Sequence, residues 1–124
     1  MTSGRLGARA VMGRALSVLA LVFVVSAVAG CAPAVSPSPV ATTSVDLPKS
    51  YRFSPEVITV AAGSTVTWTN NDNFTHNVTF TGEPALMMAP GEQATREFAA
   101  AGTYPYLCSL HPNDMQGTVI VTGG

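Results

Sequence analysis

From residue 49 onward, apolar and polar residues alternate within short segments. Glycine, proline and asparagine separate these segments. Between residues 65 and 69, Val66 and Trp68 fall on one face while threonines occupy the other. Alternation with a period of two predicts half-buried strands. We expect strands over residues 51–53, 57–60, 65–69, 76–81, 93–98, 103–108 and 118–121. About seven short strands without a helical period predict an all-β fold, an antiparallel β-sandwich.

The first 30 residues follow a different pattern. Three arginines precede an uncharged, mostly apolar run over residues 15–29, and small residues then lead to Cys31. This order is typical of an export signal, and the run is short for a membrane span. The end of the run resembles a bacterial lipobox, in which the cysteine is lipidated and becomes the first residue of the mature protein. The alternatives are a plain signal peptide cut near Ala32 and an uncleaved anchor.

Residues 31–48 are rich in proline, serine, threonine and alanine and have no apolar period. We interpret them as a tether, because extended proline-rich chain spans about 3.1 Å per residue and could reach up to about 50 Å. The predicted organisation is a lipoprotein signal peptide over 1–30, a tether with lipidated Cys31 over 31–48, and one domain over 49–124. A lipid on Cys31 would keep this domain at the outer face of the cell membrane, outside the cytoplasm.

Removal of the signal changes the charge. Three of the six basic residues lie in the signal, whereas all seven acidic residues lie beyond it, so the mature part carries a formal charge of −4. A mildly acidic domain without a basic patch argues against nucleic acid as a partner.

Cys31 and Cys108 are the two cysteines of the chain. If Cys31 is lipidated, Cys108 is a lone thiol in an oxidising compartment, where a thiol is a liability unless it is buried or bound to metal. A disulfide between the two is the alternative. It would tie a flexible terminus to the middle of a packed strand.

Side chains that bind metals gather near the C-terminus. Cys108, His111 and Met115 fall within eight residues, and His76 precedes Cys108 by 32 positions. Because His76 and Cys108 both lie where an inward-facing row meets a loop, one end of a sandwich could bring them together. Two imidazoles, a thiolate and a weak axial thioether select copper in electron-transfer sites. Singly, each residue also fits a structural role as core thiol, hydrogen-bonded histidine or apolar filling.

Zinc is the competing metal. It usually takes a closed set of strong ligands, and here the fourth ligand would have to be Asp114 or water. A long thioether bond from Met115 suits copper, whose redox level the axial ligand tunes. The two histidines of the chain are too few for a further, oxidase-like copper site. We therefore expect one copper ion, cycling between Cu(I) and Cu(II), and no enzymatic activity.

Several spaced motifs resemble the blue copper proteins, or cupredoxins, and most closely their amicyanin-like and plastocyanin-like members. The motifs are His76-Asn77-Val78, Met87-Met88, the run from Ala101 to Pro112, and Met115-x-Gly117-x-Val119. The resemblance implies a Greek-key β-sandwich of 7–8 strands with one type 1 copper. By this resemblance His76, Cys108 and His111 are the equatorial ligands and Met115 is the axial ligand. Asn77 is expected to cross-link the two ligand loops and to donate its amide to the Cys108 sulfur.

The same resemblance implies that the exposed edge of His111 is the port through which electrons pass. Pro112, Met87 and Met88 would then form an apolar collar for brief docking of a redox protein. Core packing is the alternative role for the two methionines.

The loop between the last histidine and the axial ligand departs from the family pattern. Three residues separate His111 from Met115, whereas amicyanin-like loops have two and plastocyanin-like loops have four. A count of four reaches Gln116, and glutamine is also a weak axial ligand. The Met-x-Gly-x-Val pattern favours Met115, but the residues leave Met115 and Gln116 both open.

The predicted function is that of a monomeric, membrane-tethered electron carrier with one type 1 copper, which exchanges electrons with transient redox partners outside the cytoplasm. The alternative is a protein that captures and delivers copper through the same ligands. A metal-free adhesion module is a third reading, against which the intact ligand set argues.

Overall fold

The computed structural model describes residues 4, 7, 13, 30 and 32–123. Most of the predicted signal peptide and the predicted lipidation site, Cys31, lie outside the described residues. In the described part of the chain, no helix has the length and apolarity that a membrane crossing needs.

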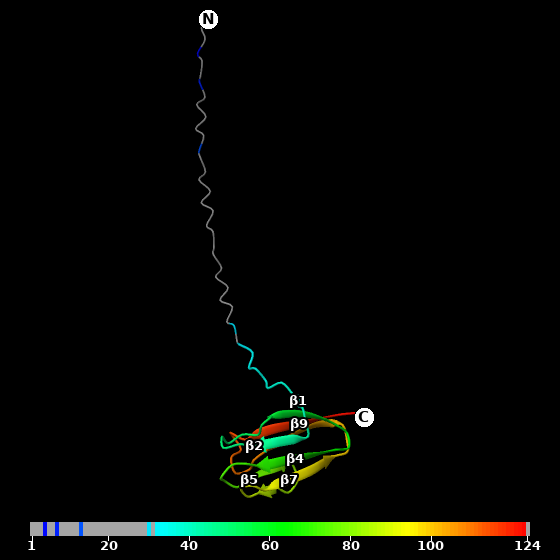
Figure 1. The fold of residues 1–124 in the computed structure, drawn as a ribbon. Coiled ribbons are helices and arrows are strands. Elements are labelled where there is room, and N and C mark those ends of the chain that lie inside the picture. Colours follow the sequence, from blue (N-terminus) through cyan, green and yellow to red (C-terminus); the bar gives the residue numbers. More distant parts are fainter. Residues whose placement is uncertain (1–3, 5–6, 8–12, 14–29, 31, 124) are drawn as a thin grey trace. The chain divides into compact units, whose positions relative to one another are not determined.

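Nine strands and no helix make up the secondary structure of the described residues (Figure 1). The strands are β1 (Val40–Ala41), β2 (Ser44–Leu47), β3 (Val57–Ala61), β4 (Ser64–Asn70), β5 (His76–Phe80), β6 (Leu86–Met88), β7 (Gln93–Phe98), β8 (Gly102–Leu107) and β9 (Gln116–Thr122). The predicted strand over residues 51–53 is absent from this set, and β6 lies where a plain connection was expected.

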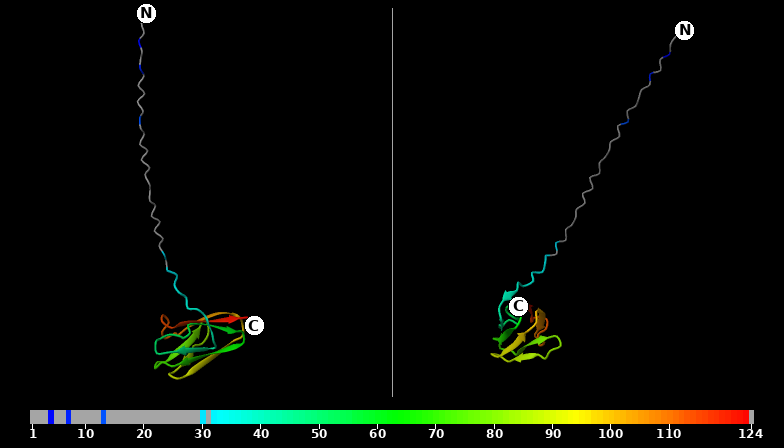
Figure 2. Two further views of the ribbon diagram at one scale, coloured as in Figure 1. Left: turned by 45° about the horizontal axis from the view of Figure 1, so that its top comes forward. Right: turned by 90° about the vertical axis from the view of Figure 1, so that its right-hand side faces the viewer.

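The strands form two sheets that pack as layers (Figure 2). One sheet has the order β1-β3-β9-β8-β5-β6 and the other has the order β2-β4-β7. The all-β sandwich is thereby confirmed, but the expectation of wholly antiparallel sheets was wrong. The pairs β1–β3, β2–β4 and β3–β9 are parallel. The first four strands alternate between the two sheets, so neighbours within a sheet are joined by crossovers, and crossovers allow parallel pairing.

Strand register explains why one end of the sandwich collects the predicted ligands. β5 and β8 are antiparallel, with Thr79 opposite Leu107, so β5 begins beside the end of β8. β8 and β9 are also antiparallel, with Leu107 opposite Gln116, so β9 begins at the same end. The first residue of β5 and the loop over residues 108–115 therefore meet.

Alternate side chains of both sheets fill the core. In β4, Val66 and Trp68 are fully buried, as the alternation predicts, while the three threonines are not. The Trp68 ring packs edge-on against Phe80 and Tyr106, with centroid distances of 6.1 and 5.4 Å. Such aromatic pairs contribute about 0.5–1.5 kcal/mol beyond the area they bury. They hold β4 of one sheet against β5 and β8 of the other, the two strands that lead to the site.

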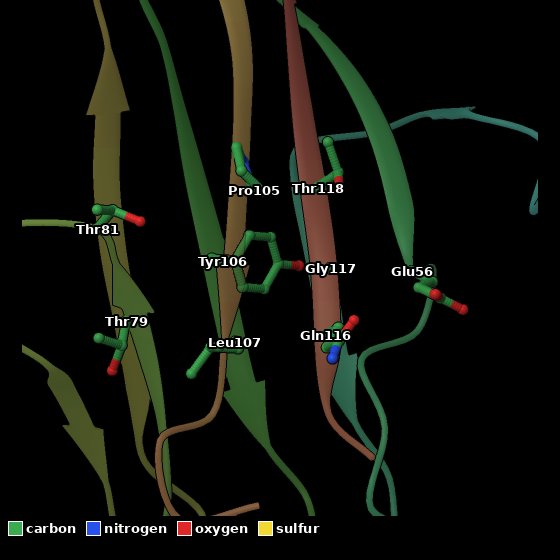
Figure 3. Close-up of a pocket in the computed structure, with 9 residues that line it drawn as sticks. All are labelled: Glu56, Thr79, Thr81, Pro105, Tyr106, Leu107, Gln116, Gly117 and Thr118. Atoms are coloured by element: carbon green, nitrogen blue, oxygen red, sulfur yellow. The ribbon is translucent and has the colours of Figure 1, made fainter. Parts of the chain in front are cut away.

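Gly117 allows a close approach between two neighbouring strands. The Tyr106 ring of β8 lies over Gly117 of β9 (Figure 3). A Cβ atom at Gly117 would lie 2.4 Å from Tyr106 Cζ, a separation that real contacts do not reach. Glycine is therefore needed here because a ring occupies the space of a side chain. Burial of that ring raises the pKa of the Tyr106 phenol above its ordinary value.

The domain begins earlier than the predicted boundary at residue 49. β1 pairs with β3, and β2 pairs with β4 over four residues. Val45 and Leu47 are 1% and 0% exposed, so they belong to the core and not to a tether. This is a correction to the predicted tether over 31–48. The proline- and serine-rich composition hid a strand that has only four residues and pairs with a distant partner.

Candidate metal centre

Two imidazoles and a thiol face one another at the end of the sandwich where β5 begins. The Sγ atom of Cys108 lies 3.9 Å from Nδ1 of His76 and 3.9 Å from Nδ1 of His111. All three potential ligand atoms lie within 4.8 Å of one another. His76 and Cys108 are fully buried, whereas His111 is half-buried. The structure therefore brings His76 to two donor residues that lie more than 30 positions later in the sequence. Cys108 carries a free thiol.

Backbone hydrogen bonds fix the loop that carries Cys108, His111 and Met115. The Cys108 amide donates to the Met115 carbonyl at 3.0 Å, which closes the loop at its base. Within the loop, the His111 amide donates to the Cys108 carbonyl, and the Met115 amide donates to the His111 carbonyl. These bonds tie the three candidate ligands to one another through the main chain, so their spacing does not depend on side-chain packing alone.

Burial separates the two candidates for the axial position. Met115 is 0% exposed and belongs to the same core cluster as Cys108. Gln116 is exposed, and its Nε2 donates to the Pro112 carbonyl at 3.0 Å. Met115 directly precedes β9, and Gln116 is its first residue. The structure thus turns Met115 inward, toward the core, and Gln116 outward.

Asp72 orients His76, and the sequence did not single it out. Its Oδ2 accepts a hydrogen bond from Nε2 of His76 at 2.8 Å, so the other ring nitrogen, Nδ1, is left to face Cys108. The Asp72 side chain is itself buried, and the Asn73 amide donates to its other oxygen. The hydrogen bond from His76 lowers the pKa of this carboxyl below its ordinary value. A carboxylate behind a metal-binding histidine fixes the ring and raises its basicity.

Asn77 joins β5 to the loop after Cys108. Its Oδ1 accepts from the Ser109 amide at 2.8 Å, and its Nδ2 donates to the Ser109 hydroxyl at 2.8 Å. Nδ2 also lies 3.4 Å from the Met87 sulfur. Asn77 therefore cross-links β5 to the loop that begins after Cys108. Among the hydrogen bonds found for the described residues, none joins Asn77 to the Cys108 sulfur.

Several apolar side chains at this end of the sandwich are exposed, as the half-buried His111 partly is. Phe74, Met87 and Leu110 are each more than half exposed, and Pro112 is exposed as well. Met88, in contrast, is 0% exposed and packs in the core. The two methionines are adjacent in β6, so they point to opposite faces. Met88 therefore packs in the core, as the alternative role predicted, whereas Met87 is exposed.

A groove of about 330 Å³ lies elsewhere, on the outer face of β5, β8 and β9 (Figure 3). It is lined by Glu56, Thr79, Thr81, Pro105, Tyr106, Leu107, Gln116, Gly117 and Thr118. None of the three facing donor residues lines it. The three candidate metal donors therefore lie outside this groove.

Comparison with known proteins gives a family match over most of the domain. The family described as copper binding proteins of the plastocyanin/azurin family matches residues 40–122. Amicyanin-alpha of Methylorubrum extorquens is 38% identical over 100 residues, which cover 75% of this chain and 82% of the relative. Plastocyanin of Scenedesmus fuscus is 37% identical over 83 residues, which cover 56% of this chain and 85% of the relative.

Solved structures show the same fold. Amicyanin from Paracoccus versutus superposes with a TM-score of 0.60 at 32% identity and covers 71% of this chain and 94% of that one. A purple cupredoxin from Nitrosopumilus maritimus superposes with a TM-score of 0.57 at 28% identity, over 64% of this chain and 98% of that one.

Proposed function

The chain belongs to the plastocyanin/azurin family of copper-binding proteins, and we propose that its copper is held by His76, Cys108, His111 and Met115. Its relatives amicyanin and plastocyanin are electron carriers with one copper ion and not enzymes, and this protein is a single-copper electron carrier of the same kind. The observation that carries the ligand assignment is the convergence of three donor atoms within 4.8 Å from separate parts of the chain.

The donor set fits copper. One thiol and two imidazole nitrogens face a common point, and Cys108 is free of any disulfide. The fourth candidate, the Met115 thioether, is buried in the same core cluster as Cys108. Thiolate and thioether donors are soft and favour copper, whereas a thioether contributes little to zinc. When bound, copper supplies a couple that accepts and returns one electron.

The surrounding residues keep the ligands in place in both redox states. Asp72 holds the ring of His76, Asn77 holds the loop after Cys108, and the loop is closed by the hydrogen bond from Cys108 to Met115. A site whose ligands are fixed by such outer contacts changes little when an electron arrives or leaves. A small change in geometry permits fast electron transfer.

Electrons are proposed to pass through the exposed edge of His111. Of the three facing donor residues, His111 alone is not fully buried. Phe74, Met87 and Leu110 supply exposed apolar surface at the same end of the domain, which suits brief contact with a redox protein.

Nucleic acid is not part of the proposal. The residues beyond residue 30 carry a formal charge of −4, which would not attract a polyanion.

Export and membrane attachment complete the proposal. We propose that residues 1–30 are an export signal, which their arginines and apolar run support, and that Cys31 carries a lipid. Residues 32–39, ahead of β1, would then join the anchor to a monomeric domain. Mass spectrometry of the mature parent protein should find acyl chains on an N-terminal Cys31, and Cys31→Ala should carry none, while its copper spectrum stays the same.

Addition of one equivalent of Cu(II) to the purified, metal-free protein tests the ligand assignment. We expect an intense visible absorption band from the bond between the Cys108 sulfur and copper, together with an electron spin resonance signal of type 1. Cys108→Ser should lose the band because the thiolate is gone, whereas Ser109→Ala should keep it. A colourless parent protein, or a coloured Cys108→Ser variant, would contradict the assignment.

A further inference from the structure

Tyr51 contacts both imidazoles of the site, although neither its position in the sequence nor the family motifs point to it. Its ring centroid lies 4.9 Å from that of His111 and 5.9 Å from that of His76, both edge-on. Aromatic rings attract one another at centroid distances of about 4.5–7 Å in such tilted arrangements. Among the described residues, no other aromatic ring outside the histidine pair contacts both imidazoles.

Tyr51 is itself held in place. The Phe74 ring stacks on it at 5.8 Å with an interplanar angle of 26°. The backbone of Tyr51 has a φ of 50°, in the left-handed region that glycine adopts readily and a bulky residue adopts at a cost. A residue persists in such a conformation where its surroundings fix it, and these residues cluster at functional sites. The cost of placing tyrosine here is offset by what its ring contacts.

The two histidines differ in how they are fixed. His76 starts a strand, is fully buried, and has its Nε2 held by Asp72. His111 lies in a loop and is half-buried. Among the hydrogen bonds found for the described residues, none involves its Nε2, and its Nδ1 faces the Cys108 sulfur. The orientation of the His111 ring therefore depends on packing, and Tyr51 supplies that packing.

We propose that Tyr51 is a positioning residue that holds the His111 imidazole toward Cys108 with or without metal, and thereby slows the release of copper. This inference rests on the proposed copper site. The His111 ring must turn away before a competing ligand can remove the ion, and the Tyr51 ring occupies one side of the space that such a turn requires.

The test compares Tyr51→Phe with Tyr51→Gly and Tyr51→Asn in the purified protein. Phenylalanine keeps the ring, while glycine and asparagine remove it and tolerate a positive φ. Two properties are measured. Nuclear magnetic resonance of the metal-free protein reports whether the His111 ring signals come from one orientation or from an average. Transfer of Cu(I) to an excess of a chelator reports the rate of metal release.

We expect Tyr51→Phe to match the parent in both measurements. The two variants without a ring should show averaged His111 signals and release copper about tenfold faster. A tenfold change in rate corresponds to the loss of the free energy of about one or two aromatic contacts. Thermal unfolding of each variant identifies any loss of fold, and the asparagine variant decides the result if the glycine variant does not fold.

Unchanged His111 signals and an unchanged release rate in both ring-free variants would overturn the proposal. Copper release from Tyr51→Phe as fast as from Tyr51→Gly would also overturn the proposal. The Tyr51 hydroxyl, and not its ring, would then slow the release of copper. A parent protein that binds no copper would refute the proposed function instead. The resonance measurement on the metal-free protein would still decide the role of Tyr51.

Discussion

Asp72 gives the sharpest test of how the protein tunes its metal. The substitution Asp72→Asn removes a buried negative charge but keeps an oxygen that can accept the hydrogen bond from His76. A negative charge close to the metal favours the oxidised, more positive ion. Its removal should therefore raise the reduction potential.

The magnitude follows from the geometry. The Asp72 oxygen lies 2.8 Å from Nε2 of His76, on the side of the ring opposite the nitrogen that faces Cys108. A bound ion would thus lie about 7 Å from the carboxylate, and two unit charges at that distance interact by about 2.4 kcal/mol at an effective dielectric constant of about 20. For a one-electron couple this corresponds to roughly 100 mV.

Asp114 provides the matched control. It also lies close to the candidate ligands, between His111 and Met115, but it is exposed to solvent. At the same distance of about 7 Å, two unit charges in water interact by only about 0.6 kcal/mol. Asp114→Asn should therefore raise the reduction potential by roughly 25 mV. Asp72→Ala should show the shift of Asp72→Asn and in addition broaden the visible and resonance spectra, because it removes the hydrogen bond that orients His76.

Redox titration of the visible band at fixed pH and ionic strength measures all three variants. A shift for Asp72→Asn no larger than that for Asp114→Asn would show that the buried carboxylate does not act through its charge. A downward shift would refute the reasoning altogether, because removal of a negative charge cannot favour the oxidised ion.

Four further substitutions test the fold and the axial ligand. Gly117→Ala should destabilise the metal-free protein by about 2 kcal/mol or more in chemical denaturation, because the added methyl group meets the Tyr106 ring. A cost near zero would mean that the ring moves freely. Leu47→Ala should cost about 2–5 kcal/mol by the same measurement, because Leu47 is fully buried. Unfolding like that of the parent would place residues 44–47 outside the core. Met115→Leu should shift the reduction potential and the visible spectrum, whereas Gln116→Ala should change neither, and the reverse result would assign the axial position to Gln116.

Alternation along the chain predicted the fold class and most of the strands, because a two-residue period depends only on which face is buried. It also placed His76 and Cys108 at strand ends, which made their meeting plausible in a sandwich. The parallel pairs could not be foreseen in the same way. They depend on how the strands are distributed between two sheets, and no local pattern records that.

Asp72 was missed because an acidic residue in an asparagine-rich loop is indistinguishable from a solvated turn in the sequence. Its burial and its partner are properties of the folded chain. The early strands were missed for a related reason. Val45 and Leu47 alternate over only four residues among prolines and serines, and their burial depends on β4, which follows some twenty residues later.

The joint assignment of Met87 and Met88 was wrong in a way that the sequence pattern could have corrected. Met87 and Met88 were assigned together, either to a collar or to the core, yet β6 sends one outward and the other inward. Recognition of that short strand would have separated them, because neighbours in a strand point to opposite faces. The signal was present but brief, since β6 has only three residues.

The placement of the first two strands has a mechanical consequence. β1 belongs to one sheet of the domain and β2 belongs to the other, so one short N-terminal segment pairs with both sheets. A pulling force on this terminus would load both sheets at once and would reach β1 and β2 before any strand that borders the ligands. Tension from the proposed lipid anchor would therefore separate β1 and β2 from the domain before it displaced the candidate copper ligands.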